Sequence, residues 1–221
     1  MSAKLTITLL VDNSESWITP FAEQVLESLA SKHDCRLIHD HVDIPTGEVL
    51  FLLGCTKRVP LLALKRNRHN LVIHESTLPI GRGWSPISWQ VLEGKNRIPM
   101  VVFEAIEELD AGDIYLRDFL ELDGTELLNE IKAKQGAKTV ELVHRIIDMY
   151  PKLKAEKQKG KPSYFSRRSR EDDRLDVEKS ILENFNHLRI VDNERFPAWF
   201  KHRGQEYILK IYKKDASHAC N

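Results

Sequence analysis

One histidine and one aspartate stand where two loops could bring an acid and a base together. His74 ends an apolar run and opens a loop rich in Pro, Gly and Ser, and Asp110 follows a second apolar run, 98–105, in a Gly-containing loop. Histidine changes charge near neutral pH, and a neighbouring carboxylate favours its charged form. We therefore predict that His74 and Asp110 form an acid–base pair at the ends of two neighbouring strands.

The elements that position this pair alternate between strand and helix patterns. The N-terminal run 5–11 is almost wholly apolar, as expected for a strand buried on both faces of a parallel sheet. Further strand patterns cover 36–39, 49–53, 71–74 and 98–105, and helix patterns cover 17–32, 60–65 and 87–93. This alternation predicts an α/β fold with a Rossmann-like, doubly wound and mostly parallel sheet, whose ligands lie beyond the carboxyl ends of the strands.

The second half of the chain changes character after Pro151. Helices are expected over 125–135, ended by Gly136, and over 139–150, and then the polar, basic segment 152–171 fits neither period. A helix over 176–188 and a hairpin over 196–213, turning at Arg203-Gly204, are expected beyond it. We predict a catalytic domain over 1–151, a surface linker over 152–171, and a C-terminal helix and hairpin subdomain over 172–221.

The composition of the 221 residues excludes several classes of protein. Lys plus Arg and Asp plus Glu balance at 33 each, which argues against a nucleic-acid-binding protein. No apolar run approaches the roughly 20 residues that span a bilayer, and the N-terminus lacks a signal-peptide layout. Cys35, Cys55 and Cys220 show no metal-ligand spacing, so we expect reduced thiols in a cytoplasmic protein without a bound metal.

Three motifs between residues 74 and 112 occur in a fixed order. They are His74, Ser76, Leu78 and Pro79, then Arg82, Gly83 and Pro86, then Leu109, Asp110 and Gly112. In this order and spacing the stretch resembles the folate-dependent formyltransferase family, whose pattern is Asn-x-His-Pro-Ser-Leu-Leu-Pro, Arg-Gly-x-x-Pro and Leu-Asp-x-Gly. The chain departs from that pattern at Val72, where the family has asparagine, and at Glu75, where it has proline.

The resemblance extends beyond these motifs. The segment 167–200 is similar to one that sugar N-formyltransferases share with methionyl-tRNA formyltransferases, and the string VDNSESWITPF resembles the first strand and loop of nucleotide-sugar formyltransferases. The string GRGWSPISWQVLEGKNRIP is similar to formyltransferases of nonulosonic-acid pathways such as that of pseudaminic acid. We therefore expect no β-barrel domain like that of the tRNA enzymes after Tyr212.

The resemblance implies an enzyme that moves a formyl group from N10-formyltetrahydrofolate to an amine. The implied acceptor is a UDP- or dTDP-linked 4-amino sugar, as used in surface polysaccharide biosynthesis. His74 as imidazolium would stabilise the oxyanion, and Asp110 would support its charge and help to carry the proton. Val72 cannot donate the hydrogen bond of the family asparagine, so Asn70 is a candidate substitute, while Arg82 is either a satisfied loop arginine or a ligand contact.

The resemblance also implies binding residues. Backbone groups of two loops would hold the folate: Lys57, Arg58 and Val59, then Ile106, Glu107, Glu108 and Leu109. The candidates for the acceptor are Asn13, Ser16, Trp17 and Ser76, although Trp17 is equally well explained as a core aromatic residue. The cluster Asp40-His41-Asp43 is interpreted as a solvated loop and not as a metal site.

Two other functions remain open at this point. One is a phosphoribosylglycinamide-type formyltransferase acting on another small amine, and the other is a folate-binding module or formyltetrahydrofolate hydrolase, which the loss of the asparagine at Val72 makes conceivable. The aromatic C-terminal hairpin cannot bury much apolar area alone, so it should pack on the main domain or on a second subunit. We expect the second arrangement, which contributes to a homodimer.

Overall fold

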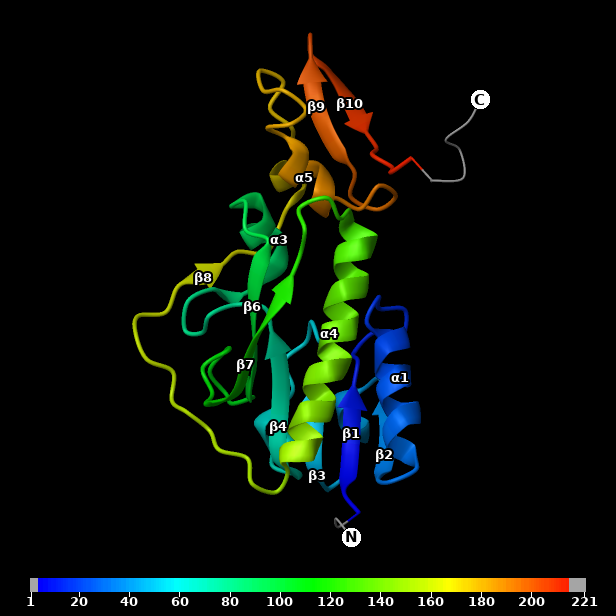
Figure 1. Ribbon diagram of the computed structural model, residues 1–221, viewed down its shortest axis with the longest axis vertical. Helices are drawn as coiled ribbons and strands as arrows, with labels where there is room; N and C mark the ends of the chain where they lie inside the picture. Colours follow the sequence, from blue (N-terminus) through cyan, green and yellow to red (C-terminus); the bar gives the residue numbers. More distant parts are fainter. Residues whose placement is uncertain (1–3, 215–221) are drawn as a thin grey trace.

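A six-stranded sheet forms the centre of the computed structural model, which describes residues 4–214 (Figure 1). Its strand order is β2-β1-β3-β4-β6-β7. Four strands are parallel: β2 (Asp34–Ile38), β1 (Thr6–Leu10), β3 (Gly47–Leu52) and β4 (Asn67–His74). The last two, β6 (Arg97–Glu104) and β7 (Ile114–Glu121), each run antiparallel to the preceding strand. The expected α/β fold with a mostly parallel sheet is confirmed.

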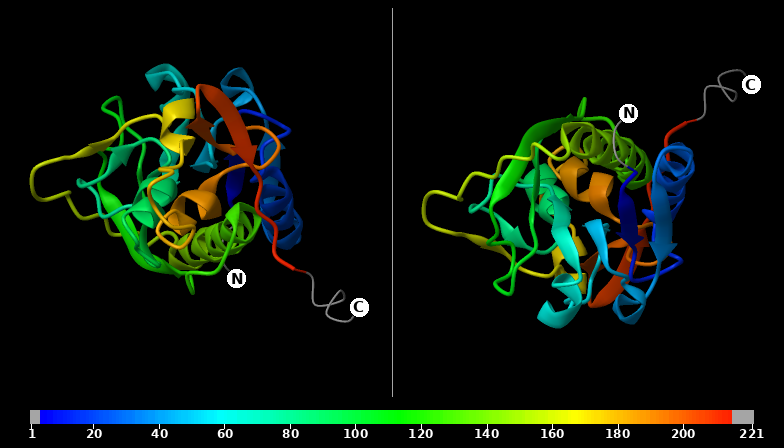
Figure 2. Two further views of the ribbon diagram at one scale, coloured as in Figure 1. Left: turned by 90° about the horizontal axis from the view of Figure 1, so that it is seen from above. Right: turned by 90° about the horizontal axis from the view of Figure 1, so that it is seen from below.

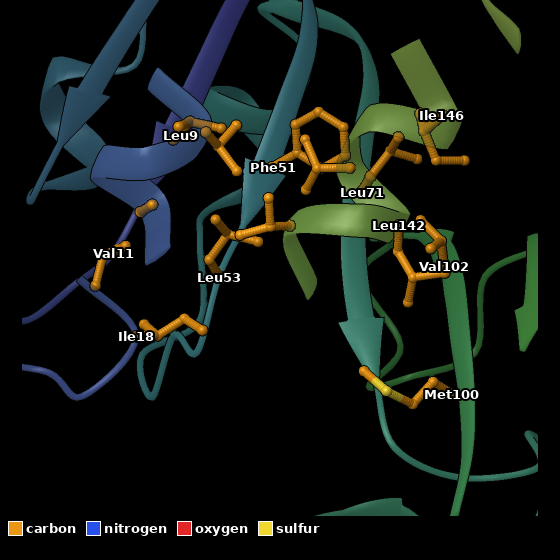
Figure 3. Close-up of a cluster of buried hydrophobic side chains, with 14 of the residues drawn as sticks. Leu9, Val11, Ile18, Phe51, Leu53, Leu71, Met100, Val102, Leu142 and Ile146 are labelled. Atoms are coloured by element: carbon orange, nitrogen blue, oxygen red, sulfur yellow. The ribbon is translucent and has the colours of Figure 1, made fainter. Parts of the chain in front are cut away.

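Helices cover both faces of this sheet, as a doubly wound arrangement requires. The main core lies beneath α1 (Thr19–Ala30), α3 (Pro86–Leu92) and α4 (Leu128–Met149). There Leu9, Phe51, Leu71 and Val102, one from each of four strands, lie on the side of Leu142 and Ile146 of α4 (Figure 3). Burying one such side chain contributes about 1.5–3 kcal/mol. The short α2 (Leu61–Leu64) packs on the opposite face.

Helix α4 is continuous where the sequence predicted two helices. Gly136 was expected to end the first, but it lies inside α4 because the helix crosses α1 closely at this point. A Cβ atom on Gly136 would come within 2.4 Å of the Phe21 ring. The glycine is therefore explained by the close approach of two helices and not by a helix end.

The C-terminal part lies at the far end of the molecule beyond α3 (Figure 1). It comprises α5 (Phe185–Ile190) and the hairpin β9 (Ala198–His202) and β10 (Gln205–Leu209), which confirms the predicted turn at Arg203-Gly204. Its own small core centres on Leu175, Leu188, Val191 and Ala198, and Ile190 reaches the main core.

The predicted helix over 176–188 was too long. Asp176 Oδ1 accepts a hydrogen bond from the Glu178 backbone N–H at 3.1 Å, and Asn184 Nδ2 donates to the Asp176 carbonyl oxygen at 2.9 Å. Side chains that bond nearby backbone in this way compete with helical hydrogen bonds. Helix begins only at Phe185.

Four short elements complete the chain. They are two 3-10 turns, η1 (His41–Asp43) and η2 (Arg170–Asp173), and the paired strands β5 (Arg82–Gly83) and β8 (Tyr164–Phe165). Burial raises the pKa of the free thiols Cys35 and Cys55 to about 11 and about 12, while Cys220 lies outside the described residues. None of the helices in residues 4–214 combines the length and apolar character needed to cross a bilayer.

Candidate active site

His74 is the last residue of β4 and is buried. Its Nε2 atom lies 2.8 Å from the Gly81 carbonyl oxygen, and its ring meets the edge of Phe103 at a centroid distance of 6.3 Å. A carbonyl oxygen only accepts hydrogen bonds, so Nε2 carries the proton. Nδ1 has no hydrogen-bond partner among residues 4–214. It is thus the nitrogen left for a reacting group.

Asp110 bonds the backbone of the loop that contains Gly81, the residue that His74 contacts. We call Gly81, Arg82 and Gly83 the glycine loop; the Gly83 N–H donates to Asp110 Oδ2 at 2.8 Å. Both glycines have positive φ angles, 78° and 104°, and Asp110 itself has a φ of 51°, which is uncommon for a residue with a side chain. His74 and Asp110 therefore meet around one loop, and within the described chain no direct hydrogen bond joins them.

The route by which Asp110 reaches this place differs from the expectation. Both residues were expected at the carboxyl ends of parallel strands, but β6 is antiparallel to β4, with Leu71 opposite Glu104 and His74 opposite Val101. The carboxyl end of β6 therefore lies beside the middle of β4. Residues 105–113, which we call the aspartate loop, bring Asp110 back to Gly83.

Arg82 is buried and bonded within the protein. Its Nη1 donates to Glu108 Oε1 at 2.6 Å and its Nη2 donates to Gln158 Oε1 at 3.0 Å. These bonds occupy both Nη atoms, while the buried Nε has no partner among the described residues. Both roles considered for Arg82, a loop residue and a ligand contact, therefore stay predictions.

This geometry can be set beside known proteins. Residues 23–147, more than half of the chain and including both His74 and Asp110, match the family described as formyl transferase. The chain belongs to the formyl transferase family. A methionyl-tRNA formyltransferase from Sulfurihydrogenibium sp. is 30% identical over 125 residues, which are 54% of this chain and 39% of that protein. The chain therefore spans about two fifths of the length of this curated relative.

Solved structures share the fold at low sequence identity. A methionyl-tRNA formyltransferase from Clostridium thermocellum has a TM-score of 0.79 at 17% identity, over 95% of this chain and 92% of that one. A 4-N formyltransferase from Francisella tularensis has a TM-score of 0.73 at 18% identity, over 95% and 98%. A complex of HypX from Aquifex aeolicus with tetrahydrofolic acid has a TM-score of 0.73 at 17% identity, over 95% and 38%.

The two departures from the family pattern have different surroundings. Val72 packs in the apolar clusters on the α2 side of the sheet and offers no hydrogen bond. The side-chain amide and the backbone N–H of Asn70 both donate to Glu104 Oε1, at 3.3 and 2.7 Å. Four strand residues, roughly 13 Å, separate Asn70 from His74. This position does not favour Asn70 as the substitute donor.

Glu75 follows His74 directly and is partly buried. Its Oε1 accepts a hydrogen bond from Gln135 Nε2 of α4 at 2.7 Å. Burial raises the pKa of Glu75, the nearby charge of His74 opposes that increase, and Asp110 adds to it. A carboxyl group tuned in this way beside a histidine is a candidate for proton transfer. Only the departure from the family pattern pointed to Glu75 in the sequence.

The two loops proposed to hold the folate are placed differently. Asp12 Oδ2 accepts the backbone N–H groups of Thr56 and Lys57, at 2.6 and 2.7 Å. The Lys57 N–H is therefore already bonded, although Lys57, Arg58 and Val59 line a small hollow with His39 and His41. In the aspartate loop, Ile106 and Leu109 are exposed, Glu107 is exposed, and Glu108 bonds Arg82.

The residues predicted to bind the acceptor lie in two places. Asn13, Ser16 and Trp17 precede α1, and Ser76 follows β4. Asn13 and Ser16 form the turn before α1, where the Asn13 carbonyl oxygen accepts the Ser16 N–H at 2.9 Å. Trp17 packs edge-on against Phe21, 6.3 Å between ring centroids, which supports its reading as a core aromatic. Ser76 is buried, and its Oγ has no partner in the part of the chain that the structure describes.

Proposed function

We propose that this protein is an N-formyltransferase that moves a formyl group from N10-formyltetrahydrofolate to the amine of a nucleotide-linked 4-amino sugar. The observation that carries the proposal is the arrangement of His74 and Asp110 on the two ends of one glycine loop, inside a chain of the formyl transferase family. The 4-N formyltransferase from Francisella tularensis, aligned over nearly its whole length, supports the acceptor class. A pseudaminic-acid type of pathway is the finer form of this proposal.

The chemistry follows from the hydrogen bonds of His74. With Nε2–H held by Gly81, a protonated ring directs its second N–H from Nδ1 toward the formyl oxygen as that oxygen becomes negative. The amine nitrogen bonds to the formyl carbon and loses a proton, the bond from that carbon to N10 breaks, and N10 gains a proton. Asp110 lies one loop away, where its charge stabilises the imidazolium and where water can relay the proton.

A methionyl-tRNA acceptor is a second candidate, because the curated relative from Sulfurihydrogenibium sp. is named a methionyl-tRNA formyltransferase. The balance of 33 basic and 33 acidic residues favours the sugar over a polyanionic acceptor.

The assay follows product mass after incubation with N10-formyltetrahydrofolate and each acceptor in turn: UDP- and dTDP-linked amino sugars, glycinamide ribonucleotide and methionyl-tRNA. We expect a gain of about 28 Da, the mass of CO, on one amino sugar. His74→Ala and Asp110→Asn should each lower the rate by roughly 100-fold or more. His202→Ala and Asp148→Asn, both exposed, are the matched controls. Formate release without any amine would instead identify a hydrolase.

We also propose a homodimer formed through the C-terminal hairpin. Tyr207 and Ile208 of β10 and Tyr212 beyond it are all exposed, with Ile208 at 64%. Tyr207 and Ile208 are consecutive in β10, so their side chains lie on opposite faces of the hairpin. Exposed apolar side chains on a small hairpin are typical of an element that a second copy covers.

A further inference from the structure

The segment predicted as a plain linker is bonded to both loops of the site. Residues 153–166, which we call the strap, leave the end of α4 and swing out along one side of the sheet (Figure 2). Beside the aspartate loop, the backbone N–H of Glu156 donates to the Ile114 carbonyl oxygen and the N–H of Ile114 donates to the Glu156 carbonyl oxygen, both at 2.8 Å. Farther along, β8 pairs with β5, and Ser163 Oγ accepts the Gly81 N–H at 2.9 Å.

Gln158 is the strap residue that connects the two loops to each other. Every other side chain between 154 and 162 is exposed, while that of Gln158 is partly buried. Its Nε2 donates to the carbonyl oxygens of Asp110 and Gly112, at 2.8 and 2.9 Å, and its Oε1 accepts from Arg82 Nη2 at 3.0 Å. Two acceptors and one cationic donor leave a single orientation of the amide that satisfies all three.

These bonds act where the backbone needs support. Asp110 is held at a φ of 51°, and a Cβ atom on Gly112 would come within 1.8 Å of the Glu104 carbonyl oxygen, so the turn is both strained and tightly fitted. Arg82 lies between the two glycines whose backbone groups meet His74 and Asp110. The Gln158 amide thus links Asp110 to the glycine loop, whose backbone groups contact both His74 and Asp110.

We propose that Gln158 is a positioning residue, which sets the placement of Asp110 relative to His74 by tying the aspartate loop to the glycine loop. The proposal rests on the proposed formyl transfer, since it assigns Gln158 a role in that reaction without contact to the reacting atoms. A misplacement of about 1 Å can lower a rate by up to about 100-fold.

The test compares Gln158→Ala with Lys157→Ala, whose side chain is exposed on the same strap. Formyl transfer to the accepted amine should show a kcat lowered on the order of 10- to 100-fold for Gln158→Ala, with the KM of the amine unchanged. The same substitution should cause no further loss in an Asp110→Asn protein, because its effect passes through Asp110. An equal loss in both backgrounds would overturn the proposal.

Amide hydrogen exchange provides a second readout that needs no substrate. The Gly83 N–H, which donates to Asp110, and the amides of residues 110–112 should exchange faster in Gln158→Ala and not in Lys157→Ala. Unchanged exchange together with unchanged kcat would show that Gln158 positions nothing. If the unaltered protein formylates no acceptor, the proposed function fails, and the exchange rates alone then decide the role of Gln158.

Discussion

Removal of the Arg189 guanidinium should lower the unfolding free energy of the protein, because this side chain attaches α5 to the segments around Asn96 and Glu126. Arg189 lies on α5 and is 1% exposed, and its partner Glu126, in the loop before α4, has a side chain 3% exposed. Nη2 lies 3.2 Å from Glu126 Oε2, and Nε donates to the Glu126 carbonyl oxygen at 3.1 Å. Nη1 donates to Asn96 Oδ1 at 3.1 Å and to Asn186 Oδ1 at 3.2 Å. One side chain therefore joins three segments.

The magnitude follows from what the change leaves behind. Breaking a buried ion pair by removing one partner costs about 3–5 kcal/mol, because the other charge stays buried. Glu126 keeps Lys134 and the backbone N–H groups of Asp123 and Gly124, which together outweigh the effect of burial and hold its pKa below the usual value. We therefore expect Arg189→Met to cost about 3 kcal/mol, near the lower limit.

Urea unfolding measures this change. With a slope of about 2 kcal/mol per molar urea, 3 kcal/mol lowers the midpoint by about 1.5 M. Arg145→Met is the matched control, since the partly exposed Arg145 bonds Asp118 and Glu141 on one face of the molecule. The double change Arg189→Met and Glu126→Gln should recover part of the loss. A shift no larger than that of Arg145→Met would refute the reasoning that the buried pair anchors α5.

The sequence was sufficient to predict the fold class and the formyl transferase family, but not the elements that support the candidate site. His74 and Asp110 stand out because their residue types and the motif around them are specific. The direction of β6 is hidden, because an apolar run buried on both faces has the same pattern whether the strand is parallel or antiparallel. The packing of the strap on the site could not be predicted from the sequence either. β5 and β8 pair through backbone groups, which every residue carries.

Glycine shows how one residue type can mislead in one place and inform in another. Gly83 was part of a motif, and the structure explains why glycine is required there. Its φ is 104°, and a Cβ atom added at this position would come within 2.5 Å of the Phe165 carbonyl oxygen. Gly136 was taken as a helix end, since nothing in the local sequence reveals Phe21 of α1 against it. Local patterns therefore predict what a segment forms and fail where a distant element decides.

Two further predictions concern the hairpin and Glu75. Sedimentation should show a dimer that Ile208→Lys converts to a monomer. Leu182 lies before α5 and is 83% exposed, so the control Leu182→Lys should stay dimeric. An unaltered protein that sediments as a monomer would show the proposed interface to be wrong. For Glu75, burial raises the pKa above its unfolded value, so the folded state holds the proton more firmly. Folding is therefore weakened as pH rises from the unfolded pKa of about 4.3 through the folded one. Replacement by glutamine removes this titration and keeps an oxygen to accept the bond from Gln135. Glu75→Gln should thus match the unaltered protein in unfolding free energy near pH 4 and exceed it at pH 8, by about 1.4 kcal/mol for each unit of the increase. Urea unfolding across that range, with the exposed Glu23→Gln as control, measures the difference. A gap that stays constant with pH would mean that Glu75 titrates alike in the folded and unfolded chains, and a carboxyl group of that kind would not be tuned for proton transfer beside His74.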